Sequence, residues 1–233
     1  MDPSVIERCN SSCGELQLQR RGKDYEIISN GVFLMATYNG ESERLLVRMP
    51  LAILDKPIEI LIGGLGVGYS LAEALNDKRV ERVVVVEIEE KIIDWNRRYL
   101  ANFSNKALLD PRTHVIHADL IEWIERTKDM FDVICLDIDN GPDWTVTDKN
   151  SVLYQDSGIS ALCRLLKPKG VIAFWSASQS VSFMEQLSRN FYKVEEIRVD
   201  QKKREPDYIY LAYIPSKKGS IKVQTKMYTA VRL

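Results

Sequence analysis

The sequence is poor in the residues that usually bind metals. It contains two histidines, His114 and His117, and of its four cysteines only Cys9 and Cys13 lie close together. No second histidine or cysteine pair stands at zinc-like spacing, so we expect no metal site. The other two cysteines fall in apolar strand-like and helix-like patterns, and we expect them to be reduced core residues.

Long apolar runs and an excess of basic charge are also absent. No apolar stretch approaches the roughly 18 residues that span a bilayer, and residues 1–10 lack the basic-then-apolar order of a signal peptide. The net charge of −1 and the isoelectric point near 6.2 give no basic footprint for nucleic acid. We therefore expect a cytoplasmic protein that binds neither a membrane nor nucleic acid.

The chain has enough apolar residues for a sizeable core, since 45% of its 233 residues are hydrophobic. From residue 55 onward, short β-branched runs alternate with segments of helical period. This alternation predicts an α/β fold, with a doubly wound, mostly parallel sheet that is covered by helices on both faces.

The predicted strands and helices follow from these periods. Five runs are expected to form parallel strands and two later ones to complete a seven-stranded sheet: 58–64, 82–88, 113–119, 132–138 and 170–177, then 191–199 and 208–214. Helices are expected at 69–77, 89–103 and 119–127. A further helix is expected to end at Pro168 and Gly170, just before the fifth strand.

The first 50 residues follow a different pattern. Residues 15–38 alternate apolar and polar side chains, with turn signals at Arg21-Gly22 and Asn30-Gly31. We therefore expect a small antiparallel β ribbon. It divides the chain into an N-terminal small β domain, residues 1–50, and a larger α/β domain, residues 51–233.

A glycine-rich loop follows the first predicted parallel strand. Four of the six residues from Gly63 to Gly68 are glycines. Such a loop lets the backbone approach a nucleotide-type ligand at the carboxyl edge of an α/β sheet. A dinucleotide fingerprint starting at Gly64 would need a glycine where Tyr69 stands. The Gly64-x-Gly66-x-Gly68 spacing is instead typical of proteins that bind S-adenosylmethionine, although packing alone also explains such loops.

Two carboxylates end the next two strands. Glu87 closes the second strand about 20 residues after the loop, where a carboxylate can accept both ribose hydroxyls of an adenosine. Asp119 closes the third strand, where it can accept the adenine amino group, and a helix N-cap explains it nearly as well. Together with the residues that follow them, Ile88 and Leu120, they are the predicted cofactor contacts.

The fourth predicted strand runs into an acidic turn. Asp137, Asp139 and Asn140 lie together before a Gly-Pro pair. Like charges raise one another's pKa, which suits a general base that deprotonates an attacking amine. These three are the candidate catalytic residues, and Asp137 is also a candidate cofactor contact; a turn that only bonds its own backbone is the alternative. Trp144 and Tyr154 are expected either to wall the substrate pocket or to pack in the core.

These motifs together resemble the spermidine/spermine synthase family, a branch of the class I methyltransferase fold, which is Rossmann-like. The likeness covers about residues 55 to 180 and includes the glycine loop, the two strand-end carboxylates, the DIDNGP loop (137–142) and the segment LCRLLKPKGVIAFWS. It implies that Glu87 binds ribose, that Asp119 binds adenine and that the 137–142 loop holds the base. It also implies a homodimer.

The sequence departs from the family pattern at positions that contact substrates. Gly66 stands where the family has an aspartate that grips the amine of decarboxylated S-adenosylmethionine. Without that charge, the carboxylate of intact S-adenosylmethionine is not repelled. The family's polyamine-binding segment reads ERLLVRMP (43–50) here, with Leu46 and Val47 at polar positions and a basic Arg48. A polycation is therefore expected to find few partners there.

Three functions remain open on the sequence. The preferred one is a transferase that uses intact S-adenosylmethionine, most simply for N-methyl transfer to a small amine, or for aminocarboxypropyl transfer. The alternative is an aminopropyltransferase that uses decarboxylated S-adenosylmethionine. The third is a non-catalytic, nucleoside-binding relative.

Overall fold

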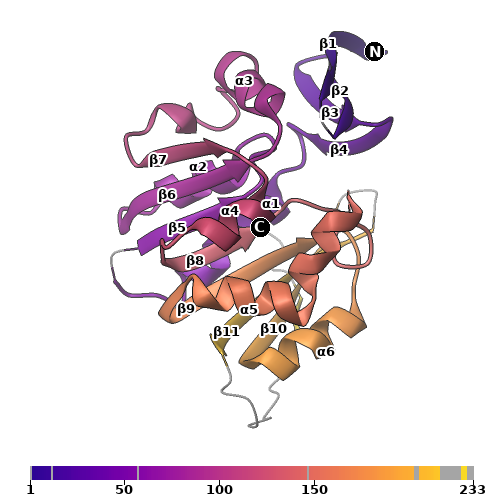
Figure 1. Cartoon of the computed structure of the whole chain (residues 1–233). Helices are drawn as coiled ribbons and strands as arrows, with labels where there is room; N and C mark the ends of the chain where they lie inside the picture. Colours follow the sequence, from indigo (N-terminus) through magenta and orange to yellow (C-terminus); the bar gives the residue numbers. More distant parts are fainter. Residues whose placement is uncertain are drawn as a thin grey trace.

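Two β-sheets organise the chain, and both are visible in Figure 1. The computed structural model describes residues 2–11, 13–56, 58–145, 147–201, 205–215 and 227–229. The smaller sheet is antiparallel and has its strands in sequence order: β1 (Ser4–Ser11), β2 (Gly14–Arg21), β3 (Asp24–Ser29) and β4 (Val32–Ala36). The expected ribbon is confirmed, and β1 is an additional edge strand that the sequence pattern did not reveal.

The tight turn between β3 and β4 shows why this ribbon folds locally. Asn30 and Gly31 have φ angles of 50° and 77°. Two consecutive positive φ angles are the signature of the two-residue turn that matches the twist of a hairpin, and Asn-Gly is its preferred sequence. The turn therefore fixes the register that brings β4 alongside β3.

The larger sheet has the order β12-β10-β11-β9-β8-β5-β6-β7. Strands β5 to β9 run parallel, whereas β11 pairs antiparallel with both β9 and β10. The predicted seven-stranded, mostly parallel sheet is confirmed, and the short β12 adds an edge strand next to β10. The strands are β5 (Ile58–Gly63), β6 (Val80–Glu87), β7 (Thr113–His117), β8 (Phe131–Leu136), β9 (Leu166–Ser176), β10 (Phe191–Val199), β11 (Asp207–Pro215) and β12 (Met227–Thr229).

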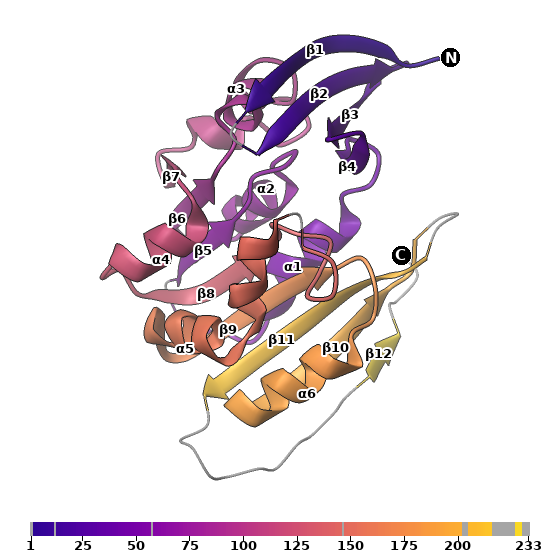
Figure 2. The same ribbon diagram turned by 45° about the vertical axis from the view of Figure 1, so that its right-hand side comes forward.

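Helices cover both faces of this sheet, as Figure 2 shows from a second side. Side chains of α1, α2 and α3 belong to one buried core, which also includes part of the small sheet, and those of α4, α5 and α6 to the other. Successive side chains of β9 point to opposite faces of the sheet, so Ala173 and Trp175 belong to the first core and Phe174 belongs to the second. The helices are α1 (Glu41–Leu51), α2 (Tyr69–Asn76), α3 (Glu90–Arg98), α4 (Leu120–Arg126), α5 (Asp156–Arg164) and α6 (Val181–Asn190), with 3₁₀ turns η1 (Ala107–Leu109) and η2 (Asp148–Tyr154).

The junction between α5 and β9 differs from expectation. Because α5 ends at Arg164 and β9 already begins at Leu166, Pro168 and Gly170 lie within the strand and do not end the helix. The pairing of β8 with β9 shifts register at this point, and Lys169 has a φ of 68°. Such a bulge is one of the places where a sheet tolerates proline.

Helix α1 links the two sheets. It packs against α2 and against strands β8, β9 and β11 of the larger sheet. The domain boundary after residue 50 stays a prediction, but by these contacts α1 accompanies the larger sheet. In the part of the chain that the structure describes, no helix has the length and apolar character needed to cross a membrane.

Candidate functional site

A cavity of about 420 Å³ lies at the carboxyl ends of the parallel strands. Its size falls within the roughly 300–1,000 Å³ of small-molecule sites. The small sheet lines one side of it, through residues such as Leu16 and Met35. Of the predicted site residues, the following line the cavity: Gly64, Gly66, Glu87, Ile88, Asp119, Leu120, Asp137, Asp139 and Asn140.

The other two predicted glycines, Gly63 and Gly68, do not line this cavity. A Cβ on Gly63 would lie 2.6 Å from Leu120 Cδ2, and one on Gly68 would lie 2.9 Å from Ser104 Cβ. For these two positions close packing explains the absence of a side chain. The two glycines that line the cavity are packed as tightly, since a Cβ on Gly64 would lie 2.3 Å from the Asp137 carbonyl oxygen and one on Gly66 2.6 Å from Met35 Sδ.

Gly66 is the glycine whose surroundings bear most on a ligand. Its φ is 51°, and a Cβ there would lie 2.6 Å from Met35 Sδ. The same sulfur accepts a hydrogen bond from the Val67 N–H at 3.0 Å, while Asn96 Nδ2 donates to the Gly66 carbonyl at 2.7 Å. The loop is therefore held from β4 on one side and from α3 on the other.

Glu87 ties the end of β6 to the glycine loop. Its Oε2 accepts a hydrogen bond from the Leu65 N–H at 2.7 Å, and its Oε1 accepts one from the Glu89 N–H at 2.9 Å. Burial raises the pKa of Glu87, although these backbone hydrogen bonds lower it in part. Each carboxylate oxygen has a second lone pair that remains able to accept from a hydroxyl. Ile88, beside it, is 40% exposed and offers an apolar surface to the cavity.

Asp119 acts as the N-cap of α4 and also lines the cavity. Its Oδ1 accepts hydrogen bonds from the backbone N–H groups of Ile121 and Glu122, at 2.8 and 3.2 Å. The N-cap explanation is therefore correct. Its Oδ2 accepts a 2.8 Å hydrogen bond from Lys149 Nζ, and both groups lie at the cavity edge.

Asp139 is held by two side chains of η2. Asn150 Nδ2 donates to its Oδ1 at 2.9 Å, and Tyr154 Oη donates to its Oδ2 at 3.1 Å. Burial raises the pKa of Tyr154 well above its usual value, so the phenol keeps its proton and acts as donor. These contacts fix the carboxylate at the cavity, where Asn140 follows it.

The expected aromatic walls are absent from this lining. Trp144 is 60% exposed, and neither it nor Tyr154 lines the cavity. Tyr154 packs at 6.2 Å and 5.4 Å, centroid to centroid, from Phe174 and Phe183. The core-packing alternative is therefore correct for Tyr154, with its hydroxyl positioned on Asp139.

Asp137 is an acid of the site whose pKa its surroundings raise strongly. Burial is the main cause that raises its pKa well above 3.8. Nearby carboxylates add to the shift, and they come from four separate segments: Glu43, Asp207, Glu87 and Asp139. A carboxyl group in such surroundings favours its protonated form.

Glu43 is a cavity residue that the sequence reasoning missed. It lies in the first turn of α1, 5% exposed, and Ser42 Oγ lies 2.9 Å from its Oε2 and 2.6 Å from Asp207 Oδ2. The signal was present in the helical period, since Glu43 shares the buried face of α1 with Leu46 and Val47. An acid on an otherwise apolar face is a candidate ligand group.

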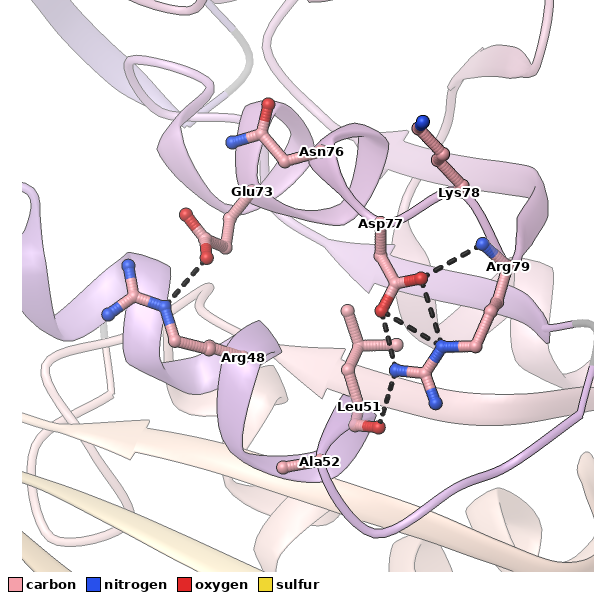
Figure 3. A pocket seen from close by; sticks show the side chains of 8 residues that line it. All are labelled: Arg48, Leu51, Ala52, Glu73, Asn76, Asp77, Lys78 and Arg79. Atoms are coloured by element: carbon pink, nitrogen blue, oxygen red, sulfur yellow. Dashed lines mark hydrogen bonds and ion pairs between the residues drawn. The ribbon is translucent and has the colours of Figure 1, made fainter.

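Arg48 lies on the opposite side of α1, in a second depression that Figure 3 shows. Its Nε donates to Glu73 Oε1 at 2.7 Å, and Arg79 pairs with Asp77 in the same depression. Both arginines of this depression are thus paired within the chain. The segment 43–50 contributes Glu43 to the main cavity, whereas Arg48 lines the second depression. The expectation that this segment offers a cation few partners did not count Glu43 and stays a prediction.

The charges of the main cavity are strongly one-sided. Lys149 is the one cationic side chain among the described residues that line it. Six carboxyl groups line the same space: Glu43, Glu87, Glu89, Asp119, Asp137 and Asp139. Within the described residues, no group of three or more histidine, cysteine, aspartate or glutamate side chains is placed to hold a metal ion. The arrangement favours an organic cation as ligand.

Known proteins resemble this chain in both sequence and fold. A polyamine aminopropyltransferase of Saccharolobus solfataricus is 31% identical over 173 residues, 73% of this chain and 54% of that protein. One of Prochlorococcus marinus is 28% identical over 158 residues, 65% of this chain and again 54% of the relative. This chain thus spans about half the length of the curated relatives that it matches.

Solved structures agree on the fold. Spermidine synthase from Thermotoga maritima superposes with a TM-score of 0.75 at 19% identity, over 90% of this chain and 72% of that one. A spermidine synthase in complex with the transition state analogue AdoDATO superposes with a TM-score of 0.76 at 19% identity, over 90% of this chain and 73% of that one. The spermine/spermidine synthase domain model matches residues 41–230. The chain therefore belongs to the spermine/spermidine synthase family.

Proposed function

We propose that this protein transfers an aminopropyl group from decarboxylated S-adenosylmethionine to a small amine. The observation that carries the proposal is the charge of the cavity, which, among the described residues, six carboxyl groups line against a single lysine. The proposal agrees with the names of the curated relatives, which are polyamine aminopropyltransferases. It replaces the preference for intact S-adenosylmethionine that the sequence suggested.

The nucleoside would lie across the strand ends of β5, β6 and β7. Its ribose hydroxyls would meet Glu87, and its adenine would lie between Ile88 and Leu120 with its amino group toward Asp119. The backbone at Gly64 and Gly66 carries no side chain that would fill this space. Both the apolar and the polar groups of the lining therefore fit an adenosine.

The donor's tail is what distinguishes the two cofactors. Intact S-adenosylmethionine carries a carboxylate on the tail, and the decarboxylated form carries only an ammonium. Lys149, the cationic side chain found in the described part of the lining, is engaged with Asp119 and Glu122, at the adenine end. A tail carboxylate would therefore face Asp137, Glu43 and their neighbours without a counter-ion, whereas an ammonium would be attracted.

The proposed roles of the two aspartates follow from their surroundings. A bound sulfonium donor supplies an electrophilic methylene carbon and leaves as a neutral thioether. Asp139, held by Asn150 and Tyr154, is placed to take the proton of the attacking amine. Asp137, whose pKa is raised in the free protein, is suited to lose its proton when a cationic donor binds and to face the donor's ammonium as a carboxylate.

Transfer from intact S-adenosylmethionine is the second candidate, and Gly66 is the observation that favours it. With no side chain at this position, the loop itself places no negative charge beside the tail. The expected homodimer stays a prediction that accompanies either function.

Product analysis decides between these functions. The protein is incubated with each donor and a panel of diamines, and the nucleoside released is identified by mass spectrometry. We expect 5′-methylthioadenosine from the decarboxylated donor. Release of S-adenosylhomocysteine from intact S-adenosylmethionine would identify methyl transfer and overturn the proposal. Tight nucleoside binding without any product would leave the non-catalytic relative.

A further inference from the structure

Lys149 occupies an unusual place at the adenine end of the cavity. Its Nζ lies 2.8 Å from Asp119 Oδ2 and 3.1 Å from Glu122 Oε1. The lysine comes from η2, whereas both acids belong to the start of α4. Half of its side chain is exposed. An ion pair in such a position contributes little to stability, so stability is a weak reason for this arrangement.

The Asp119–Lys149 pair presents a hydrogen-bond acceptor and a donor side by side. Asp119 Oδ2 receives one hydrogen bond from Lys149, and its second lone pair remains able to accept another. Lys149 Nζ has three hydrogens, two of which its aspartate and glutamate partners use. One acceptor position and one donor position therefore remain at the cavity edge.

Adenine carries the complementary pattern on its edges. Its amino group is a donor, and a ring nitrogen that accepts hydrogen bonds lies next to it on either side. A base whose amino group donates to Asp119 Oδ2 brings one of these ring nitrogens within reach of Lys149 Nζ, because the two protein atoms are 2.8 Å apart. Asparagine and glutamine recognise adenine in nucleic acids by the same bidentate pattern.

We infer that Lys149 is a specificity residue that donates a hydrogen bond to a ring nitrogen of the donor's adenine. Together with Asp119 it selects an amino-purine, because a 6-oxo purine would direct its oxygen at the Asp119 carboxylate. The inference rests on the proposed nucleoside site and deepens it. Glu122 keeps the lysine aligned when the base occupies Asp119.

The test combines removal of the Lys149 ammonium with removal of single ring nitrogens from the ligand, and compares the losses in binding affinity. Binding of 5′-methylthioadenosine and of its 1-deaza and 7-deaza analogues is measured by calorimetry with the wild type and with Lys149→Met. We expect Lys149→Met to weaken binding of the parent nucleoside by roughly 3- to 20-fold. One of the two deaza analogues should bind the wild type more weakly than the parent nucleoside does, by a similar factor. The affinity of this analogue should not fall further in Lys149→Met.

A purely electrostatic or structural role predicts a different result. If Lys149 only neutralises Asp119, Lys149→Met will weaken all three ligands by the same factor, and that result overturns the inference. Lys91→Met is the matched control, since Lys91 lies outside the cavity and pairs with Glu7; it should leave all three affinities unchanged. The 5′-methylthioinosine analogue should bind the wild type at least tenfold more weakly than the adenosine form, and equal binding of the two would contradict the selection.

The result is independent of the proposed reaction. A protein that binds the nucleosides with this pattern but transfers no aminopropyl group would disprove the proposed function and keep the assignment of Lys149. If the protein forms 5′-methylthioadenosine but Lys149→Met weakens the binding of all three ligands equally, the proposed function is supported and the assignment of Lys149 is disproved.

Discussion

Tyr154 and Asp139 are joined by a hydrogen bond of 3.1 Å, in which the buried phenol donates to the Oδ2 of an aspartate at the cavity. The other carboxylate oxygen is held by Asn150. A carboxylate fixed through both oxygens has a defined orientation toward any amine that enters the cavity. This is the geometry that a general base requires.

Replacing Asp139 by asparagine should therefore affect turnover far more than donor binding. We expect kcat to fall at least ~100-fold, the usual contribution of a general base, with a change of donor affinity below about threefold. Tyr154→Phe should lower kcat less, by roughly 3- to 30-fold, because Asn150 still holds the carboxylate. Steady-state kinetics and calorimetry measure both quantities. A larger loss in Asp137→Asn than in Asp139→Asn would assign the base to Asp137.

Asp119 has a structural role as well as a proposed ligand role, and two substitutions separate them. Asp119→Ala removes the N-cap of α4 and should destabilise the fold by about 1 kcal/mol, whereas serine is itself a good cap and should keep most of that stability. Both should weaken nucleoside binding by roughly 5- to 100-fold. Urea denaturation and calorimetry provide the readouts. If Asp119→Ser binds the nucleoside with wild-type affinity, Asp119 acts only as the N-cap of α4.

The contact between Gly66 and Met35 predicts a coupling between the two sheets. Gly66→Ala would place a Cβ 2.6 Å from Met35 Sδ at a φ of 51°. Gly22 is the matched control, since its φ is 63° and, in the described part of the chain, no heavy atom beyond its two chain neighbours lies within 4 Å of a Cβ there. We expect about 1 kcal/mol of destabilisation for Gly22→Ala and more for Gly66→Ala.

The double variant tests the cause of that difference. Met35→Ala combined with Gly66→Ala should be more stable than the sum of the single effects by at least ~0.5 kcal/mol, because the shortened side chain removes the clash. Chemical denaturation of the four proteins completes the cycle. Equal losses at Gly22 and Gly66, or strict additivity, would show that the loop moves away without strain.

The raised pKa of Asp137 predicts a proton release upon binding of a cationic ligand. Burial and surrounding carboxylates raise this pKa, and a bound ammonium or sulfonium lowers it again. The complex therefore holds fewer protons than the free protein, and binding should tighten as the pH rises between the two pKa values. The observed heat of binding should consequently depend on the ionisation enthalpy of the buffer.

Neutral 5′-methylthioadenosine is the natural comparison for this effect. It should release fewer protons than decarboxylated S-adenosylmethionine, and Asp137→Asn should abolish most of the difference. Calorimetric titrations in two buffers at one pH are sufficient. Buffer-independent heats for the cationic donor would mean that Asp137 keeps the same charge in both states.

The strand ends of the site were predictable because local sequence determines them. The apolar runs placed Glu87 at the end of β6, as observed, and Asp119 at the end of a strand that in fact stops two residues earlier, at His117. Parallel strands bring such ends to one edge of a sheet. The glycine loop was visible for the same reason. The role of Asp119 was harder to predict from the sequence, because this residue both caps α4 and lines the cavity.

The residues that complete the site were not predictable from local patterns. Met35, Lys149 and Asn150 reach it from β4 and η2, which carry no glycine or charge motif of their own. Their positions depend on how separate elements pack. The bulge at the start of β9 was missed for a related reason, because proline and glycine punctuate both a helix end and a bulge.

The small N-terminal sheet supplies Leu16 and Met35 to a site whose acids come from the larger sheet and from α1. Substitutions in this sheet can reshape the space left for an incoming molecule while the acids stay where they are. Among related chains, the molecule that fits the cavity can thus be exchanged for another by substitutions in the small sheet alone, without any change to the acidic residues.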